Sequence, residues 1–136
     1  MSHLVPPPEP ALDEEERALL AKGLDEFGRR LFFECHDTLE ELWSGVRGPS
    51  RDFFQGLIQT AVGFYHLGNG NRDGARRLFD RALARLERYP PRYAGVDAGP
   101  LRASVARFRD ALAGGGEPPA EEPPLIGLSR SPRGDA

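Results

Sequence analysis

The chain has 136 residues, 29% of them charged, and a formal net charge of -3 at pH 7. This length suits one domain with a single core and a shallow groove rather than an enclosed cavity, and the charge excludes a general attraction to nucleic acid or anionic lipid. One cysteine, no apolar run approaching about 18 residues and no signal-peptide pattern indicate a cytoplasmic protein in a reducing compartment, with no membrane partner.

The first predicted helix begins at Asp13. Residues 1–12 before it are rich in proline, which removes backbone donors and disfavours helix in the preceding residue, so we expect them to be disordered. Asp13 and Glu16 have the spacing of a capping box. Apolar residues then recur on one helical face, namely Leu20, Leu24, Phe27 and Leu31.

Two further helices follow. The second carries a buried stripe at alternating steps of three and four residues, formed by Phe32, Cys35, Leu39, Leu42 and Val46. The third starts at Gly48, Pro49 and Ser50, because proline suits a first helical turn and serine can cap exposed amides. It is expected to run to about Leu67.

An antiparallel hairpin joins the third helix to a fourth. Residues 68–74 are dense in turn formers, and the inner face of the fourth helix holds Ala75, Leu78, Phe79, Ala82 and Leu86. Pro100 then opens a fifth helix, which Gly114 stops. The inner face of the fifth helix consists of Leu101, Val105, Phe108 and Leu112.

These patterns predict an all-α protein, a compact bundle of about five helices with a central antiparallel helical hairpin. No segment shows the alternation that is typical of a strand. Residues 13–113 are expected to form a single helical domain, and residues 114–136 a tail rich in proline and glycine. Within the tail we expect the apolar residues 123–128 to dock on the core and residues 129–136 to be disordered.

Two stripes of side chains could meet between the second and third helices. On the second helix, a stripe beside the buried one begins at Phe33, and on the third helix Gly63 is expected to leave room for close approach. If the stripes face each other, they line a polar groove of the kind in which helical bundles place metals and ligands. The candidate ligand-binding residues of this groove are His36, Glu40, Trp43, Gln55, Gln59 and His66.

Three interpretations of the groove follow. Our leading hypothesis is a non-catalytic ligand- or protein-binding domain. The alternative is a small hydrolase in which His36 and His66 hold a metal or act as acid and base, while Glu40 orients one of them. In the third interpretation these side chains only satisfy one another and fix the helix register. A divalent metal is not the favoured cofactor, because imidazoles and amides form a poorer set of metal ligands than a carboxylate-rich cluster does. The sequence does not decide whether the chain is an enzyme.

Aromatic residues occur in adjacent pairs at 32–33, 53–54 and 64–65, so not every ring can face the core. We therefore expect a surface that binds a second copy of the chain or another protein. The fourth helix also carries a stripe of arginines. Because acidic residues interrupt that helix, we expect a solvated face rather than binding of nucleic acid.

Three segments form an ordered set of motifs: FFECHDTLEELW from Phe32, FFQGLIQTAVGFYH from Phe53 and GNRDGARRLF from Gly70. These motifs resemble those of the bacterial and archaeal domain of unknown function family numbered 309. The resemblance covers about residues 24–90 and implies a compact helical fold, with no established activity or cofactor. Two positions depart from the family pattern: Arg30 stands where glycine is usual, and Asp37 replaces the commoner glutamate. The matching positions are Glu34, His36, Asp37, Glu40, Trp43, Gln55, Gly56, Gln59, His66, Asn71 and Ala75.

Overall fold

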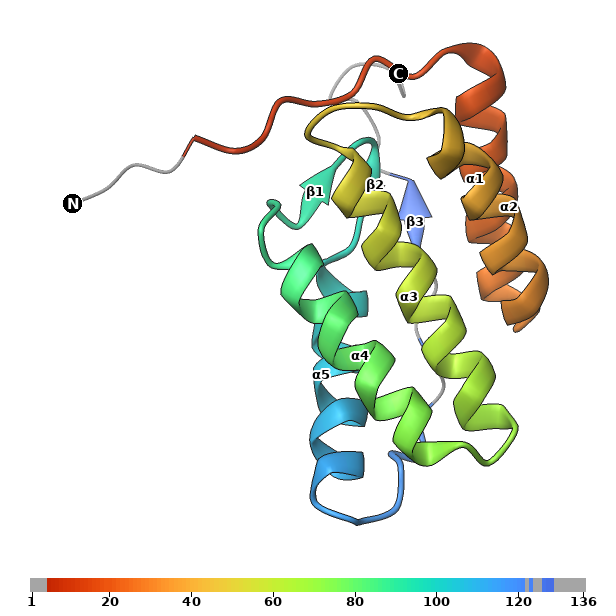
Figure 1. Cartoon of the computed structure of the whole chain (residues 1–136), viewed down its shortest axis with the longest axis vertical. Coiled ribbons are helices and arrows are strands. Elements are labelled where there is room, and N and C mark those ends of the chain that lie inside the picture. Colours follow the sequence, from red (N-terminus) through yellow and green to blue (C-terminus); the bar gives the residue numbers. More distant parts are fainter. Residues whose placement is uncertain (1–4, 122, 124–125, 129–136) are drawn as a thin grey trace.

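The structure is a computed structural model that describes residues 5–121, 123 and 126–128 (Figure 1). The expected disorder of residues 129–136, and of the first four residues, lies outside the described residues. Within the described part of the chain, no helix is long and apolar enough to cross a membrane. The described helices are α1 (Glu14–Gly28), α2 (Phe32–Gly45), α3 (Arg51–Gly68), α4 (Arg72–Leu86) and α5 (Gly99–Ala113).

The helices pack as the all-α bundle that the sequence predicts. Figure 1 shows α1 and α2 on one side of α3, with α4 and α5 on the other. The centre of this arrangement is Phe64 of α3, which is buried. Its ring centroid lies between 4.8 and 5.9 Å from the centroids of four other rings, which belong to Phe27, Phe32, Phe79 and Phe108. A single aromatic core therefore joins all five helices.

The start of α1 confirms the predicted capping box. The carboxylate of Asp13 accepts a hydrogen bond from the Glu16 amide at 2.7 Å, and the Glu16 carboxylate accepts one from the Asp13 amide at 3.0 Å. The end of α1 differs from the prediction at Leu31. The helix ends at Gly28, and Arg30 adopts a φ of 65°, which reverses the chain. Leu31 is consequently the residue before α2 and is 36% exposed, so its predicted place on the buried face of α1 is wrong.

The predicted antiparallel hairpin of α3 and α4 is confirmed, and two glycines of α3 bring the two helices close together. A Cβ atom added to Gly63 would lie 2.5 Å from Cε1 of Phe79, and one added to Gly56 would lie 2.8 Å from Cδ2 of Leu86. The absence of side chains at these two positions lets α3 and α4 approach each other. Gly63 therefore faces α4, and the expectation that it opens the contact between α2 and α3 is wrong.

A small antiparallel sheet follows α4. The sequence patterns do not predict this sheet. It consists of β1 (Arg92–Tyr93), β2 (Val96–Asp97) and β3 (Gly127–Leu128), in that order. Ala94 and Gly95 connect the first two strands with φ values of 56° and 75°, as a two-residue hairpin turn with two positive φ angles requires. Val96 pairs with Tyr93 on one side and with Leu128 on the other.

The same hairpin holds residues near the beginning of the chain. The Tyr93 hydroxyl donates a hydrogen bond to the Pro8 carbonyl at 2.5 Å, and the Ala94 amide donates one to the Glu9 carboxylate at 2.7 Å. Ile126, beside β3, is 8% exposed. Segments from both ends of the described chain thus lie against β1 and β2.

Candidate functional site

The second and third helices bring His36 and His66 to one small pocket. Because α2 and α3 are antiparallel neighbours, the first half of α2 lies beside the last turns of α3. The pocket between them has a volume of about 140 Å³. Its lining consists of Phe32, Phe33, His36, Val62, Tyr65 and His66. Two of the six candidate residues therefore line the pocket, and the other four lie elsewhere on the same two helices.

His36 is held by its own helix. Its Nδ1 lies 3.0 Å from the Phe33 carbonyl oxygen, and because a carbonyl can only accept, Nδ1 carries the proton and donates it. In the neutral ring Nε2 is then unprotonated, and it lies 3.5 Å from Oε2 of Glu40. That distance exceeds the roughly 2.7–2.9 Å of a charge-assisted hydrogen bond. While His36 is neutral, its Nε2 and Oε2 of Glu40 are therefore both acceptors.

His66 is held by the turn between α3 and α4. The Asn71 side-chain oxygen accepts a hydrogen bond from the Gly74 amide at 3.0 Å, which directs the amino group of Asn71 toward His66. Its Nδ2 lies 3.4 Å from Nδ1 of His66, so Nδ1 accepts and the proton is on Nε2. In their neutral forms the two histidines therefore have opposite tautomers.

Two exposed aromatic side chains of the pocket lining, Phe33 and Tyr65, form what we call the aromatic rim. Phe33 is 49% exposed and Tyr65 is 39% exposed, and their ring centroids are 5.5 Å apart. The Phe33 ring also lies 5.2 Å from the His36 ring. In contrast, Phe53 and Phe54 are both buried. The exposed members of the aromatic pairs thus gather at one place, where α2 begins and α3 ends.

The other end of the predicted groove is filled. The Arg51 guanidinium lies 3.7 Å from the centre of the Trp43 ring, and it donates hydrogen bonds to the Trp43 and Val46 carbonyls. Nε1 of Trp43 and Oε1 of Gln59 are buried without a hydrogen-bond partner, and Gln55 is half-buried. The contact of Arg51 with Trp43 therefore joins the start of α3 to the end of α2.

A third group of side chains bears on metal binding. Among the described residues, the ligand atoms of His36, Asp37 and Glu40 all lie within 4.8 Å of one another. His66 is not a member of this group.

The nearby thiol of Cys35 belongs to the core, where burial, reinforced by the charge of Glu26, raises its pKa to about 12. Cys35 is therefore protonated at neutral pH and is not a nucleophile.

These features define a helical-bundle domain with a small apolar pocket that two histidines flank. Residues 20–78 match the family described as Domain of unknown function (DUF309). The match covers 59 of the 136 residues, in the segment that runs from α1 into α4. That segment contains both helices of the pocket, whereas α5, the sheet and the residues before α1 lie outside the match.

Two relatives are similar to parts of the chain. The uncharacterized protein YpuF from Bacillus subtilis (strain 168) is 39% identical over 59 residues, which are 43% of this chain and 34% of YpuF. An uncharacterized protein from Aquifex aeolicus (strain VF5) is 26% identical over 73 residues, which are 53% of this chain and 22% of the relative. The chain thus spans about a third and about a fifth of the lengths of these relatives.

Proposed function

We propose that the chain is a non-catalytic protein-binding domain whose contact surface is centred on the pocket between α2 and α3. The observation that carries the proposal is the pocket's size together with its rim. At about 140 Å³ the pocket is smaller than the roughly 300–1,000 Å³ that small-molecule sites have, but it can accept one apolar side chain. Exposed aromatic residues around such a pocket are typical of the central contacts of protein interfaces.

The charge of α2 indicates which partner would fit. Four acidic residues on this helix are exposed and the helix contains no lysine or arginine, the four being Glu34, Asp37, Glu40 and Glu41. A complementary partner surface would carry lysine or arginine around an apolar anchor.

A selection of random displayed peptides tests this proposal. We expect the selected peptides to share an aliphatic or aromatic residue flanked by lysine or arginine, and to bind the wild-type chain. Phe33→Ser and Tyr65→Ser should each weaken binding by at least about tenfold, because the anchor loses its apolar contacts. Both side chains are partly exposed, so these variants should fold.

Leu128→Ser is the matched control, because Leu128 is an equally exposed apolar side chain at the sheet. Its peptide affinity should equal that of the wild-type chain. Peptides that bind both pocket variants as tightly as wild type, or a selection that yields no binder, would contradict the proposal.

The second candidate function is a metal-assisted hydrolase that uses His36, Glu40 and His66. The observation that favours this function is the distance of 3.5 Å between Nε2 of His36 and Oε2 of Glu40. Two ligands about 2.0–2.2 Å from a tetrahedral Zn²⁺ are separated by roughly 3.3–3.6 Å, so the pair is spaced to share an ion. The hydrogen bond from Nδ1 to the Phe33 carbonyl is also the type that orients a metal-bound histidine.

Zinc titration of the metal-stripped chain separates the two candidates. A metal site predicts that Zn²⁺ raises the melting temperature, that His36→Ala and Glu40→Gln abolish this rise, and that the loaded chain cleaves an activated ester. Glu41→Gln is the control, because Glu41 is exposed on the same helix and lies outside the group of ligand atoms. An equal zinc response in all four proteins would contradict the metal-assisted function.

A further inference from the structure

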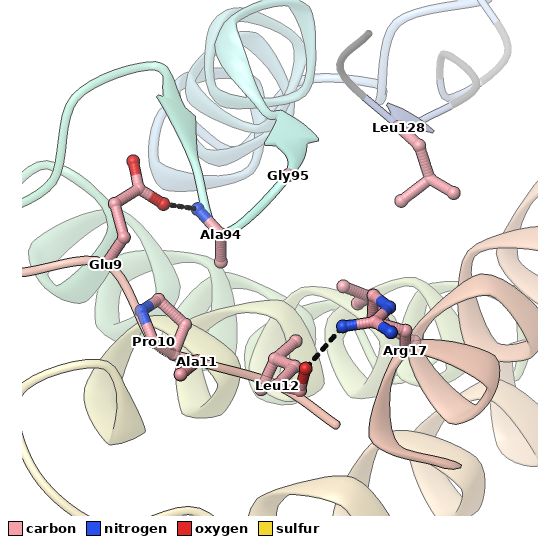
Figure 2. Close-up of a pocket in the computed structure, with 9 residues that line it drawn as sticks. Glu9, Pro10, Ala11, Leu12, Arg17, Ala94, Gly95 and Leu128 are labelled. Carbon is pink, nitrogen blue, oxygen red and sulfur yellow. Dashed lines mark hydrogen bonds between the residues drawn. The ribbon is translucent and has the colours of Figure 1, made fainter. Parts of the chain in front are cut away.

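A second and larger cavity lies between the first half of α1 and the small sheet (Figure 2). Its volume is about 510 Å³, which is within the range of small-molecule sites. Four separate segments border it: residues 9–12, the first half of α1, the turn between β1 and β2, and β3. Of its lining residues only Leu20 falls within the segment that matches the family.

The cavity contains a guanidinium group, that of Arg17, which forms no ion pair with a described carboxylate. Figure 2 shows the Arg17 side chain at one side of the space, where it donates one hydrogen bond, at 2.5 Å, to the Leu12 carbonyl. Within the described part of the chain, no carboxylate oxygen lies within 4.0 Å of it. The Glu9 carboxylate instead accepts the hydrogen bond of the Ala94 amide. Most of the five N–H donors of Arg17 are therefore available to a ligand.

The remaining walls are largely apolar. Leu20 is buried beneath the cavity, Leu12 is half-buried, and Ala94 is 8% exposed. Leu128 projects from β3 toward the same space and is 52% exposed (Figure 2). A ligand that occupies the cavity can therefore cover an exposed leucine while its charged end reaches Arg17.

We infer that this cavity binds a small monocarboxylate with an apolar body, whose carboxylate pairs with Arg17. A guanidinium matches a carboxylate through two parallel hydrogen bonds, and the apolar walls suit an alkyl or aryl group. Among its lining residues the site carries a single cation, Arg17, and a single carboxylate, that of Glu9. This balance favours a monoanion over a phosphate dianion.

Calorimetric titration with butanoate, hexanoate and octanoate tests the inference on the full chain. Affinity should increase by about threefold to fourfold for each added methylene that the cavity buries. Hexan-1-ol, which has the same body without the charge, should bind at least about tenfold more weakly than hexanoate. Hexyl phosphate should also bind more weakly than hexanoate, because it brings a second negative charge.

Two variants and a control locate the site. Arg17→Gln should lower the hexanoate affinity by at least about tenfold. Leu128→Glu should lower it similarly, because the new carboxylate competes for Arg17, and this variant keeps the test valid if Arg17→Gln alters the fold. Arg81→Gln, which removes an exposed arginine of α4, should leave the affinity unchanged. No saturable binding at millimolar hexanoate, equal binding of hexan-1-ol, tighter binding of hexyl phosphate, or unchanged affinity in the folded Arg17 and Leu128 variants would each overturn the inference.

Discussion

Arg30 holds a backbone conformation that its side chain disfavours. Its φ of 65° lies in the left-handed region, where a residue with a Cβ is strained by about 1–2 kcal/mol and glycine is not. This strain gives a physical reason for the glycine that the family pattern has at this position. We expect Arg30→Gly to raise the free energy of unfolding by up to about 1 kcal/mol, since relief of strain outweighs the added entropy of the unfolded chain.

Urea denaturation of Arg30→Gly beside Arg29→Gly checks this prediction. Arg29 has a φ of -89°, which any residue adopts, so glycine there relieves no strain and should lower stability by a few tenths of a kcal/mol to about 1 kcal/mol. If both variants lose stability equally, the left-handed conformation of Arg30 is not a source of strain.

Gly63 is the residue whose replacement should damage the hairpin most directly. Alanine would place a Cβ 2.5 Å from Cε1 of Phe79, whose ring is fully buried among other aromatic side chains and cannot swing away. We expect Gly63→Ala to cost about 1–3 kcal/mol of unfolding free energy. Gly68→Ala is the matched control on the same helix, because nothing lies within 4 Å of its new Cβ. This control should be neutral or slightly stabilising, and an equal loss in both variants would contradict the packing argument.

At the scale of elements, Asn71 connects the start of α4 to the pocket. Its oxygen caps α4 at the Gly74 amide, and its amino group faces Nδ1 of His66. Asn71→Ala should therefore cost about 1 kcal/mol of stability through loss of the cap. Asn71→Asp keeps a capping oxygen but removes the donor, so stability should be retained while the proton of His66 moves to the other ring nitrogen.

Nitrogen chemical shifts of the His66 ring above pH 8 distinguish these outcomes. We expect the proton to be on Nε2 in the wild-type chain and on Nδ1 in Asn71→Asp, because a carboxylate oxygen in place of the amino group can only accept a hydrogen bond. A ring that keeps its proton on Nε2 in the variant would show that another contact fixes the tautomer.

The helices were predictable from sequence because each buries a continuous stripe of side chains. Such a stripe appears in the sequence as apolar residues at helical spacing. Strands of two residues are too short to show any alternation, so the sheet left no pattern in residues 92–97. Leu31 was misplaced for a related reason. Its spacing continues the stripe of α1, yet the turn at Arg30 takes it off that helix, and a turn made by arginine lacks the usual glycine signal.

The candidate site was predictable only where two helical faces determine it. The meeting of His36 and His66 follows from the stripes of α2 and α3 once those helices pack as antiparallel neighbours. The spacing could not show that Gly63 faces α4, because a glycine on a helix gives no indication of which neighbour approaches it. The cavity beside Arg17 was not foreseen either, since residues 9–20 form it together with residues 94–95 and 128, which are distant in sequence.

At the scale of the whole molecule, two buried titratable groups, the Cys35 thiol and the Tyr93 hydroxyl, make stability depend on pH. Burial raises the pKa of the Cys35 thiol from 9.0 to about 12, and that of the Tyr93 hydroxyl from 10.0 to about 12. The folded state thus keeps these protons to a higher pH than the unfolded chain does. As pH rises from about 9 toward 12 the unfolded chain binds fewer protons, so the free energy of unfolding falls.

Urea denaturation at stepped pH values measures this loss. We expect these two groups to leave stability unchanged between pH 7 and 8.5, and to lower it by a few kcal/mol toward pH 12. Tyr93→Phe should flatten the part of the decline above pH 10, because phenylalanine has no proton to release. A decline of the same slope in this variant would show that Tyr93 does not carry it.

Residues from both ends of the described chain contact the hairpin of β1 and β2. These contacts constrain the order in which parts of the fold form during synthesis. The hydrogen bond from Tyr93 to Pro8 spans 85 residues, so residues 5–12 leave the ribosome long before their partner exists. The helices α1 to α4 can pack on one another during that interval, because domains form from the N-terminus as the chain emerges. Leu128 emerges still later, and only its arrival gives the cavity beside Arg17 its last wall. A nascent chain halted before β3 would therefore hold the helical core and the histidine pocket while the cavity beside Arg17 was still open.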